Sequence, residues 1–289
     1  METLKNYLGQ IIQQQVSGES WQWLQEKVSN IGNAAQFNLA FAAIPRKVGK
    51  NSIKIDEEEI KTVQQLRSGL SIKNWTIDRL CRVWLLMHLD ADNQEAYIRT
   101  IENLFITADM NEQVALYSAL PVLAYPEHWQ KRCAEGIRSN IGDVLKAIMC
   151  NNPYPAEQLP PAAWNQLVLK AFFTEKPINE IIGLDRRANE ELAHILSDYA
   201  HERWAAHRTV NPLLWRCVGP FIDEKIFPDI ERIAASENKE DQMAAVLVCR
   251  QSSYPPAKAL LHEHSALQSS AKDSTLSWDA IAQKAGGVQ

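Results

Sequence analysis

The sequence lacks the short motifs by which many enzymes are identified. Its 11 glycines among 289 residues form no GxGxxG or Walker loop of the kind that binds nucleotide phosphates. The GxSxG turn of serine hydrolases and the HEXXH helix of zinc proteases are also absent. The sequence therefore predicts no cofactor, and any chemistry would have to rest on residues outside these motifs.

Cysteine is sparse, odd in number and never paired as CxxC. Such spacing favours free, buried thiols in a reducing compartment, so we expect a cytoplasmic protein. Cys217, which follows Arg216, is the one cysteine we consider as a reactive thiol, and packing is the better interpretation of all five. The five are Cys81, Cys133, Cys150, Cys217 and Cys249.

Excess positive charge and long apolar runs are missing as well. The net charge is −5, and no basic stripe is visible, which argues against a nucleic-acid partner. The densest apolar run, residues 83–89, is far shorter than the ~20 residues of a membrane span. The amino terminus has no basic segment followed by a long apolar core, so we expect neither a signal peptide nor a membrane span.

Strand-like alternation is almost absent, whereas apolar residues recur at helical spacing along the whole chain. The sequence therefore predicts an all-α fold. Residues 151–155, NNPYP, are predicted to be non-helical, and Pro161 opens the next helix. We predict helices over 2–16, 20–30, 34–45, 56–68, 76–89, 93–107, 111–124, 127–139, 141–150, 161–174, 189–208, 223–235, 239–252 and 256–264.

Two segments are similar enough to suggest a repeat. QVALYSALPVLAYP (113–126) and QMAAVLVCRQSSYP (242–255) both run from glutamine to Tyr-Pro at the same spacing. One interpretation is a HEAT-like array of antiparallel helix pairs, an α-solenoid; the other is an irregular helical bundle in which any two such helices look alike. We expect N-terminal repeats over 1–150, a motif-bearing region over 151–267 that continues the array, and a weakly ordered tail over 268–289 with at most one short helix near 277–284.

The densest charge and aromatic content lies in residues 183–221. Asn189 is expected to cap a helix whose core face carries Leu192, Ile195, Leu196, Tyr199 and Ala206. Arg203 falls in the middle of that face, so we expect it to be buried and paired with a carboxylate. The predicted structural ion-pair network comprises Arg203 with Asp185, Asp223 and Glu224.

The opposite face of the same helix carries His194, Asp198, His201 and Glu202. The first three stand at i, i+4 and i+7, which would suit a metal ion, but a solvated polar face is the more common outcome, and we predict no metal site. His201 with Asp198 or Glu202 could instead act as an acid–base pair, which would make the protein an enzyme.

Arginine and tryptophan are concentrated in this segment. Guanidinium groups bind carboxylate and phosphate, and indole faces add stacking area, so the set could hold a planar or anionic ligand. Internal ion pairing is the competing interpretation. The predicted ligand or partner residues are Arg186, Arg187, Asp198, His201, Glu202, Trp204, Trp215 and Arg216.

Three runs resemble the EboA family, whose genes cluster with other Ebo genes of metabolite traffic: NNPYPAEQLPPAAWNQLVLKAFF (151–173), IGLDRRANEELAHILSDYAHERWAAHR (182–208) and LWRCVGPF (214–221). The resemblance implies a role in secondary-metabolite trafficking, with other Ebo-cluster proteins as partners. Together with the residues, it favours a non-enzymatic binding or scaffold protein that holds an anionic small molecule or a partner protein at 183–221.

Overall fold

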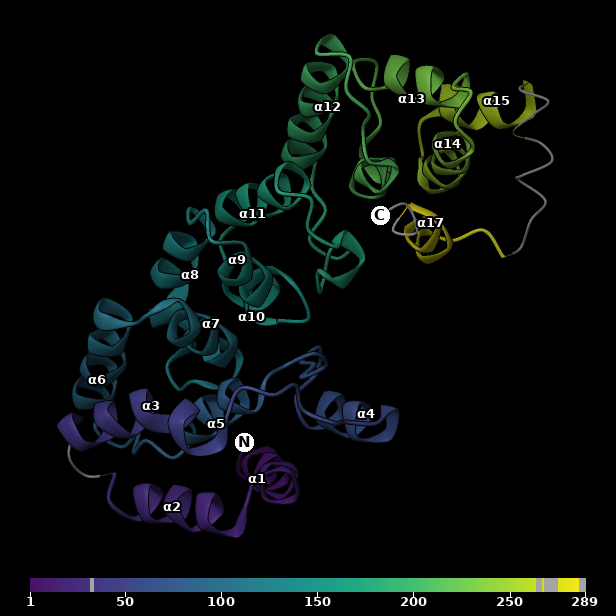
Figure 1. Cartoon of the computed structure of the whole chain (residues 1–289). Coiled ribbons are helices and arrows are strands. Elements are labelled where there is room, and N and C mark those ends of the chain that lie inside the picture. The colour runs from purple at the N-terminus through teal and green to yellow at the C-terminus, as the bar shows by residue number, and fades with distance from the viewer. Residues whose placement is uncertain (32–33, 264–266, 268–274, 286–289) are drawn as a thin grey trace. The chain divides into compact units, whose positions relative to one another are not determined.

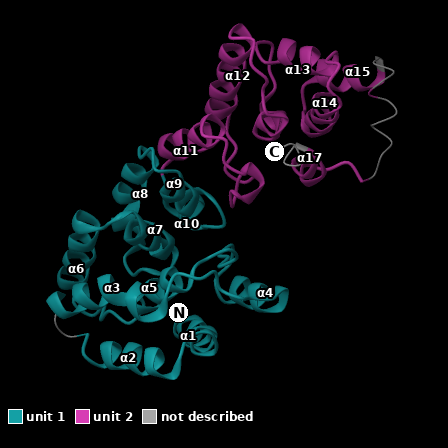
Figure 2. Cartoon of the chain, in the orientation of Figure 1, with its two compact units in different colours: residues 1–159 teal, residues 160–289 magenta. Residues whose placement is uncertain are grey.

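The computed structural model describes residues 1–31, 34–263, 267 and 275–285. Helices make up 70% of the structure, and the described residues contain no β-strand, only an isolated bridge between Ser52 and Thr76. The prediction of an all-α fold is confirmed (Figure 1). The chain divides into two compact units, 1–159 and 160–289 (Figure 2).

Unit 1 consists of short helices joined by tight loops. Asp56 and Asp109 each begin a helix with a capping box, closed by Glu59 and Glu112 respectively. The helices are α1 (Glu2–Gln15), α2 (Gly18–Ser29), α3 (Ala34–Val48), α4 (Glu57–Leu66), α5 (Ile77–Leu86), α6 (Gln94–Thr107), α7 (Met110–Ala119), α8 (Gln130–Ile137), α9 (Gly142–Met149) and α10 (Tyr154–Gln158).

The prediction that residues 151–155 are non-helical is wrong for its last two residues. Tyr154 and Pro155 open α10, and Pro155 lies in the first turn, where its missing N–H costs no helical hydrogen bond. Asn152 prepares this start, because its Oδ1 accepts from the Tyr154 N–H at 3.0 Å. Elsewhere the predicted helices are present with boundaries shifted by a few residues.

The core of unit 1 is built around α5, every residue of which is buried except Arg79. Helices α1, α3 and α7 all pack against α5, and α7 packs in turn against α9. Contact between every second helix is also how helical repeats stack. The succession of contacts from α3 through α5 and α7 to α9 is compatible with a HEAT-like array. That array stays a prediction for the chain.

A buried arginine connects this core to a proline. Pro45 lies inside α3 and has no N–H to donate to the Phe41 carbonyl. Arg82 Nε donates to that carbonyl instead, at 3.2 Å, and its Nη1 lies 2.7 Å from Asp78 Oδ2. Arg82 is 1% exposed. Its buried charge is satisfied by the Asp78 carboxylate and by the Phe41 carbonyl that Pro45 leaves free.

Unit 2 is arranged around one central helix, α14, and not as a succession of helices that each contact the next. Helices α13, α15 and α17 and two 3₁₀ turns, η4 and η5, all contact α14. Its elements are α11 (Pro161–Phe173), η3 (Ile178–Glu180), α12 (Glu190–Ala205), η4 (Pro212–Cys217), η5 (Gly219–Phe221), α13 (Phe227–Ala234), α14 (Lys239–Gln251), α15 (Pro255–Glu263) and α17 (Trp278–Ala285).

The short helix predicted near 277–284 is confirmed by α17. Ile281 of α17 is fully buried, and the helix packs against α14 and η4, so this part of the predicted tail belongs to unit 2. The remainder of the predicted tail, 268–274 and 286–289, lies outside the described residues.

Candidate ligand-binding pocket

Helix α12 is joined to α11 at its N-cap residue, Asn189. Asn189 caps α12 as predicted, because its Oδ1 accepts from the Leu192 N–H at 2.9 Å. The same side chain exchanges hydrogen bonds with Asn165 of α11 at 2.9 and 3.3 Å, and Asn165 is 1% exposed. A buried amide pair of this kind sets how the two helices diverge from a common point.

The buried face of α12 differs from the predicted one. Its buried residues are Leu192, Ala193, Leu196, Ser197 and Ala200. Tyr199 is only half-buried and Ala206 is exposed, although both were expected in the core. The small side chains of Ala193, Ser197 and Ala200 allow a neighbouring element to approach closely, so their face is the buried one. Tyr199 then lies at the edge of the buried face.

Arg203 shares that edge, and the prediction of a buried, carboxylate-paired arginine is wrong. Arg203 is half-buried, and its Nε donates to the Thr209 carbonyl at 2.9 Å. No carboxylate of the described residues lies within 4.0 Å of its guanidinium. Of its expected partners, Asp223 lies 3.1 Å from His194 Nε2, Asp185 binds another arginine, and Glu224 is exposed.

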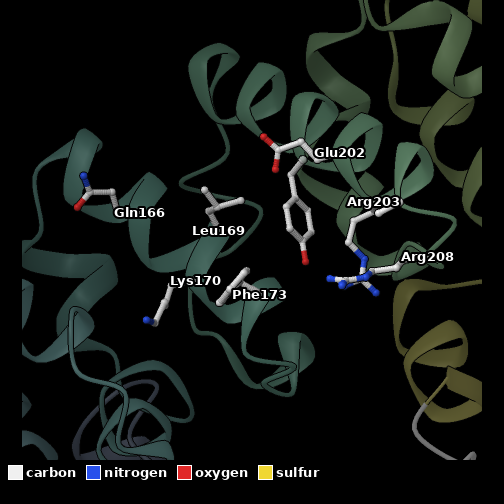
Figure 3. A pocket seen from close by; sticks show the side chains of 9 residues that line it. Gln166, Leu169, Lys170, Phe173, Glu202, Arg203 and Arg208 are labelled. Carbon is white, nitrogen blue, oxygen red and sulfur yellow. The ribbon is translucent and has the colours of Figure 1, made fainter.

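Between α11 and α12 lies a pocket of about 460 Å³ (Figure 3). Leu169 and Phe173 of α11 and Tyr199 of α12 give it apolar walls, and Phe173 is 68% exposed despite its size. The lining residues are Gln166, Leu169, Lys170, Phe173, Tyr199, Glu202, Arg203, Ala206 and Arg208. The pocket thus combines carbon surface with charged groups at its margin.

Positive charge predominates among these groups, with Lys170, Arg203 and Arg208 against the single carboxylate of Glu202. The arginine guanidinium groups lie on the same side of the pocket (Figure 3). The backbone joins them, since the Arg208 N–H donates to the Arg203 carbonyl at 2.8 Å. The side chain of Arg208 forms no hydrogen bond or ion pair with any described residue. An anionic group entering here would meet an arginine not already neutralised.

The other predicted arginines lie elsewhere. Arg216 binds Asp185 through two hydrogen bonds of 2.6 Å, and this contact raises the pKa of the guanidinium. Arg187 lies with its Cζ 5.1 Å from the centre of the Trp164 ring, and burial and the neighbouring Arg186 lower its pKa. None of the three lines the α11–α12 pocket.

The two predicted tryptophans form a stack. Trp215 is fully buried, and its ring lies 5.9 Å from that of Trp204. The Arg232 Cζ lies 4.1 Å from the centre of the Trp204 ring. Arg232 comes from α13 and was missed by sequence reasoning. Trp204 also lines a second, polar cavity of about 620 Å³ whose other residues include Arg208, Arg232 and Asp241.

His201 has an acidic partner, but neither of the predicted ones. Its Nε2 lies 2.6 Å from Oδ1 of Asp229, and the Ser197 hydroxyl donates to the other oxygen at 2.6 Å. Asp229 is 4% exposed and lies in α13, whereas Asp198 and Glu202 are exposed. The only sequence signal for Asp229 was a carboxylate among apolar residues at the start of a helix.

No group of three or more histidine, cysteine, aspartate or glutamate side chains within the described part of the chain could hold a metal ion. The three side chains that stand at metal-ligand spacing do not converge, since His194 binds Asp223 and His201 binds Asp229. All five cysteines are free and buried, as predicted. Burial raises the pKa of the Cys217 thiol to about 12, so Cys217 is not a thiolate at neutral pH.

Comparison with known proteins gives one finding. The family described as "Metabolite traffic protein EboA" matches residues 4–219, a range that includes every residue of the α11–α12 pocket and excludes Asp229 and Arg232. No curated protein and no solved structure matches the chain. Among the described helices, none has the length and apolar character to cross a membrane. Since the match covers well over half of the sequence, the chain belongs to the EboA family.

Proposed function

We propose that this protein is a non-enzymatic binding component of metabolite traffic and that it holds an anionic, partly apolar small molecule in the α11–α12 pocket. The observation that carries the proposal is the unpaired Arg208 beside Arg203 at the margin of an apolar cavity. The family description supplies the context of metabolite traffic.

The lining of the pocket supports both parts of this ligand description. Leu169, Phe173 and Tyr199 would cover a ring or an isoprenoid-like chain, and each 100 Å² of apolar area removed from water contributes about 2.5 kcal/mol. A charge-assisted hydrogen bond to each arginine contributes about 1.5–3 kcal/mol. Because association itself costs several kcal/mol, micromolar affinity requires the pocket to be preformed.

The amide pair of Asn165 and Asn189 supports preformation, since it fixes α11 against α12 without a ligand. The backbone bond between Arg208 and Arg203 likewise fixes the two main-chain positions from which the cations extend. Rigid placement reduces the entropy lost on binding.

Fluorescence titration with 8-anilinonaphthalene-1-sulfonate, an anionic aromatic probe, tests the proposal. We expect saturable binding to the wild type and about tenfold weaker binding to Arg208→Gln, because one charge-assisted contact is lost. The matched control is Arg186→Gln, which removes the same charge from an exposed residue outside the pocket. The neutral probe N-phenyl-1-naphthylamine should not distinguish the two variants.

Equal affinity of the two variants for the anionic probe would contradict the proposal. Mass spectrometry of small molecules released from the purified protein would then identify the natural ligand class, and we expect acidic compounds with an aromatic or isoprenoid part. Neutral or cationic compounds alone would count against it.

One observation favours an enzyme as the second candidate function. The His201 imidazole, 53% exposed at its side chain, binds the buried Asp229 through Nε2, an arrangement that orients histidine as a general base or acid. The acid–base hypothesis therefore still rests on His201, but its carboxylate partner is Asp229 and not Asp198 or Glu202. His201→Gln should abolish turnover of any substrate found and should leave binding of the anionic probe unchanged.

We also propose a cytoplasmic location and cooperation with other Ebo-cluster proteins. Five free, buried cysteines support a reducing compartment, since secreted proteins of this size usually pair theirs. Fractionation of the native organism, followed with an antibody to this chain, would test the location.

A further inference from the structure

A second hollow lies in unit 1, far along the sequence from the proposed ligand pocket. It is a groove of about 610 Å³ between α2 and α3, and its residues are Trp23, Lys27, Asn30, Gln36, Phe37, Leu39, Ala40, Ala43 and Lys47. Phe37 and Ala40 are buried and make an apolar floor, while Leu39 is 72% exposed on the rim. A large exposed aliphatic side chain beside an apolar groove is typical of a contact surface.

The charge of this groove has one sign. Lys27 and Lys47 line it, and none of its nine lining residues is acidic, although the chain as a whole carries a charge of −5. The two ammonium groups lie 5.7 and 5.9 Å from the centre of the Trp23 ring. Both cations therefore lie close to one indole that lines the groove, and carboxylates on an occupant would complement them.

The fold joins the two helices that form the groove. Ser20 Oγ of α2 donates to the Lys47 carbonyl of α3 at 2.7 Å, and Phe37 stacks on Phe41 along α3 at 6.4 Å. The lining residues of α3 extend from Gln36 to Lys47, so at 1.5 Å per residue the groove runs for about 16 Å. That length accommodates about three turns of a helix, whose apolar residues at i, i+3, i+4 and i+7 would reach the floor.

We propose that the α2–α3 groove docks an acidic amphipathic helix of a partner protein. The apolar floor with Leu39 takes the apolar face of that helix, and Lys27 and Lys47 bind glutamate or aspartate at its edges. This inference is independent of the ligand pocket, because the two sites share no residue and lie in different units.

Fluorescence polarisation with a designed peptide tests the proposal. The probe is a fluorescein-labelled helix of about 14 residues with leucine at i, i+3, i+4 and i+7 and glutamate on its flanks. We expect saturable binding that weakens as salt is raised, and about tenfold weaker binding to the double variant Lys27→Glu/Lys47→Glu. The same peptide with lysine in place of glutamate should not bind the wild type.

The matched control is Lys50→Glu/Lys54→Glu, which makes the same change of charge at two exposed lysines outside the groove. Equal binding to both double variants, or equal binding of the lysine peptide, would overturn the proposal. Two other outcomes would do the same: adsorption to phosphatidylglycerol vesicles without peptide binding would indicate a membrane surface, and concentration-dependent dimerisation lost in Lys27→Glu/Lys47→Glu would indicate a second copy of the chain. Leu39→Asp should weaken peptide binding even at high salt.

Discussion

The core arginines of unit 1 and the pocket arginines of unit 2 differ in whether a carboxylate binds them, although Arg216 of unit 2 is also paired, with Asp185. In unit 1, Arg82 is sealed inside the core against Asp78, Arg67 Nη1 lies 2.8 Å from Glu157, and Arg132 binds both Glu102 and Glu135. In unit 2, Arg203 and Arg208 stand at a cavity with no carboxylate of the described residues within 4.0 Å. The density of arginine in a sequence therefore does not locate a site; an arginine without a carboxylate partner beside an apolar cavity is the better indication.

This difference assigns different roles to the same residue type. A buried, paired arginine contributes mainly to the specificity of the core, and breaking its pair is costly. An arginine at a cavity margin contributes little to folding and remains available to a ligand. The predictions below test whether the two units separate in this way.

The largest effect is expected in unit 1 on replacing Asp78 by leucine. This change leaves Arg82 buried with only the Phe41 carbonyl at 3.2 Å and Glu112 at 3.8 Å, so it should lower the free energy of unfolding by about 3–5 kcal/mol. Urea denaturation followed by circular dichroism measures it. Glu157→Leu, which breaks a more exposed pair of the same unit, should cost about 1 kcal/mol or less. Equal costs would remove the contrast.

A smaller effect concerns acid. Burial, and then the charge of Lys5, lower the pKa of His88 to about 4, against a reference near 6.5. The unfolded chain binds this proton more readily between those values, so stability should fall as pH drops from about 6.5 to about 4. Partial exposure reduces the expected loss to about 1–2 kcal/mol.

His88→Gln should remove that part of the acid sensitivity, as urea denaturation at pH 7 and pH 5 would show. His207→Asn serves as the control, because His207 is exposed in unit 2 and its φ of 55° suits asparagine. A wild-type difference that survives in His88→Gln would refute the assignment.

Glycine positions give a third comparison. A Cβ on Gly136 of unit 1 would lie 2.6 Å from the Tyr117 ring and 2.5 Å from Ile148 Cδ1, both in the core. A Cβ on Gly219 of unit 2 would meet chiefly the tip of Gln251 at 2.7 Å, which can move aside. Gly136→Ala should therefore destabilise by about 1–3 kcal/mol and Gly219→Ala by less. Thermal unfolding of the two variants ranks them directly.

Most of the helices could be predicted because their signals are local. Apolar spacing, Asn189 at one helix start and proline at several others depend on residues within one or two turns. The exception, α10, opens with Tyr154 and Pro155, where a proline that usually ends a helix occupies its first turn. Local rules leave such a choice to tertiary context.

The site was predicted only in its region. The wheel placed Arg203 in the core beside Leu192 and Leu196. Both leucines are buried, but Ala193, Ser197 and Ala200 complete the buried face, and Arg203 is only half-buried. Which face of a helix is buried depends on how closely its neighbours approach, and a single helix sequence does not carry that information. Asp229 and Arg232 were missed for the same reason, since their partners on α12 lie 28 residues away for both His201 with Asp229 and Trp204 with Arg232.

The smallest effect on stability is expected for Arg203→Leu. If Arg203 were buried and paired with a carboxylate, its replacement would lower the stability of unit 2 strongly. Arg203 is instead half-buried, and its side chain donates only to the carbonyl of the exposed Thr209, which water can satisfy. The free energy of unfolding should therefore change by about 0.5 kcal/mol or less. Affinity for 8-anilinonaphthalene-1-sulfonate should nevertheless fall about tenfold, because leucine keeps the apolar wall and removes the cation. A large loss of stability with unchanged affinity would reverse the contrast between the units, since Arg203 would then belong with Arg82 as a structural arginine.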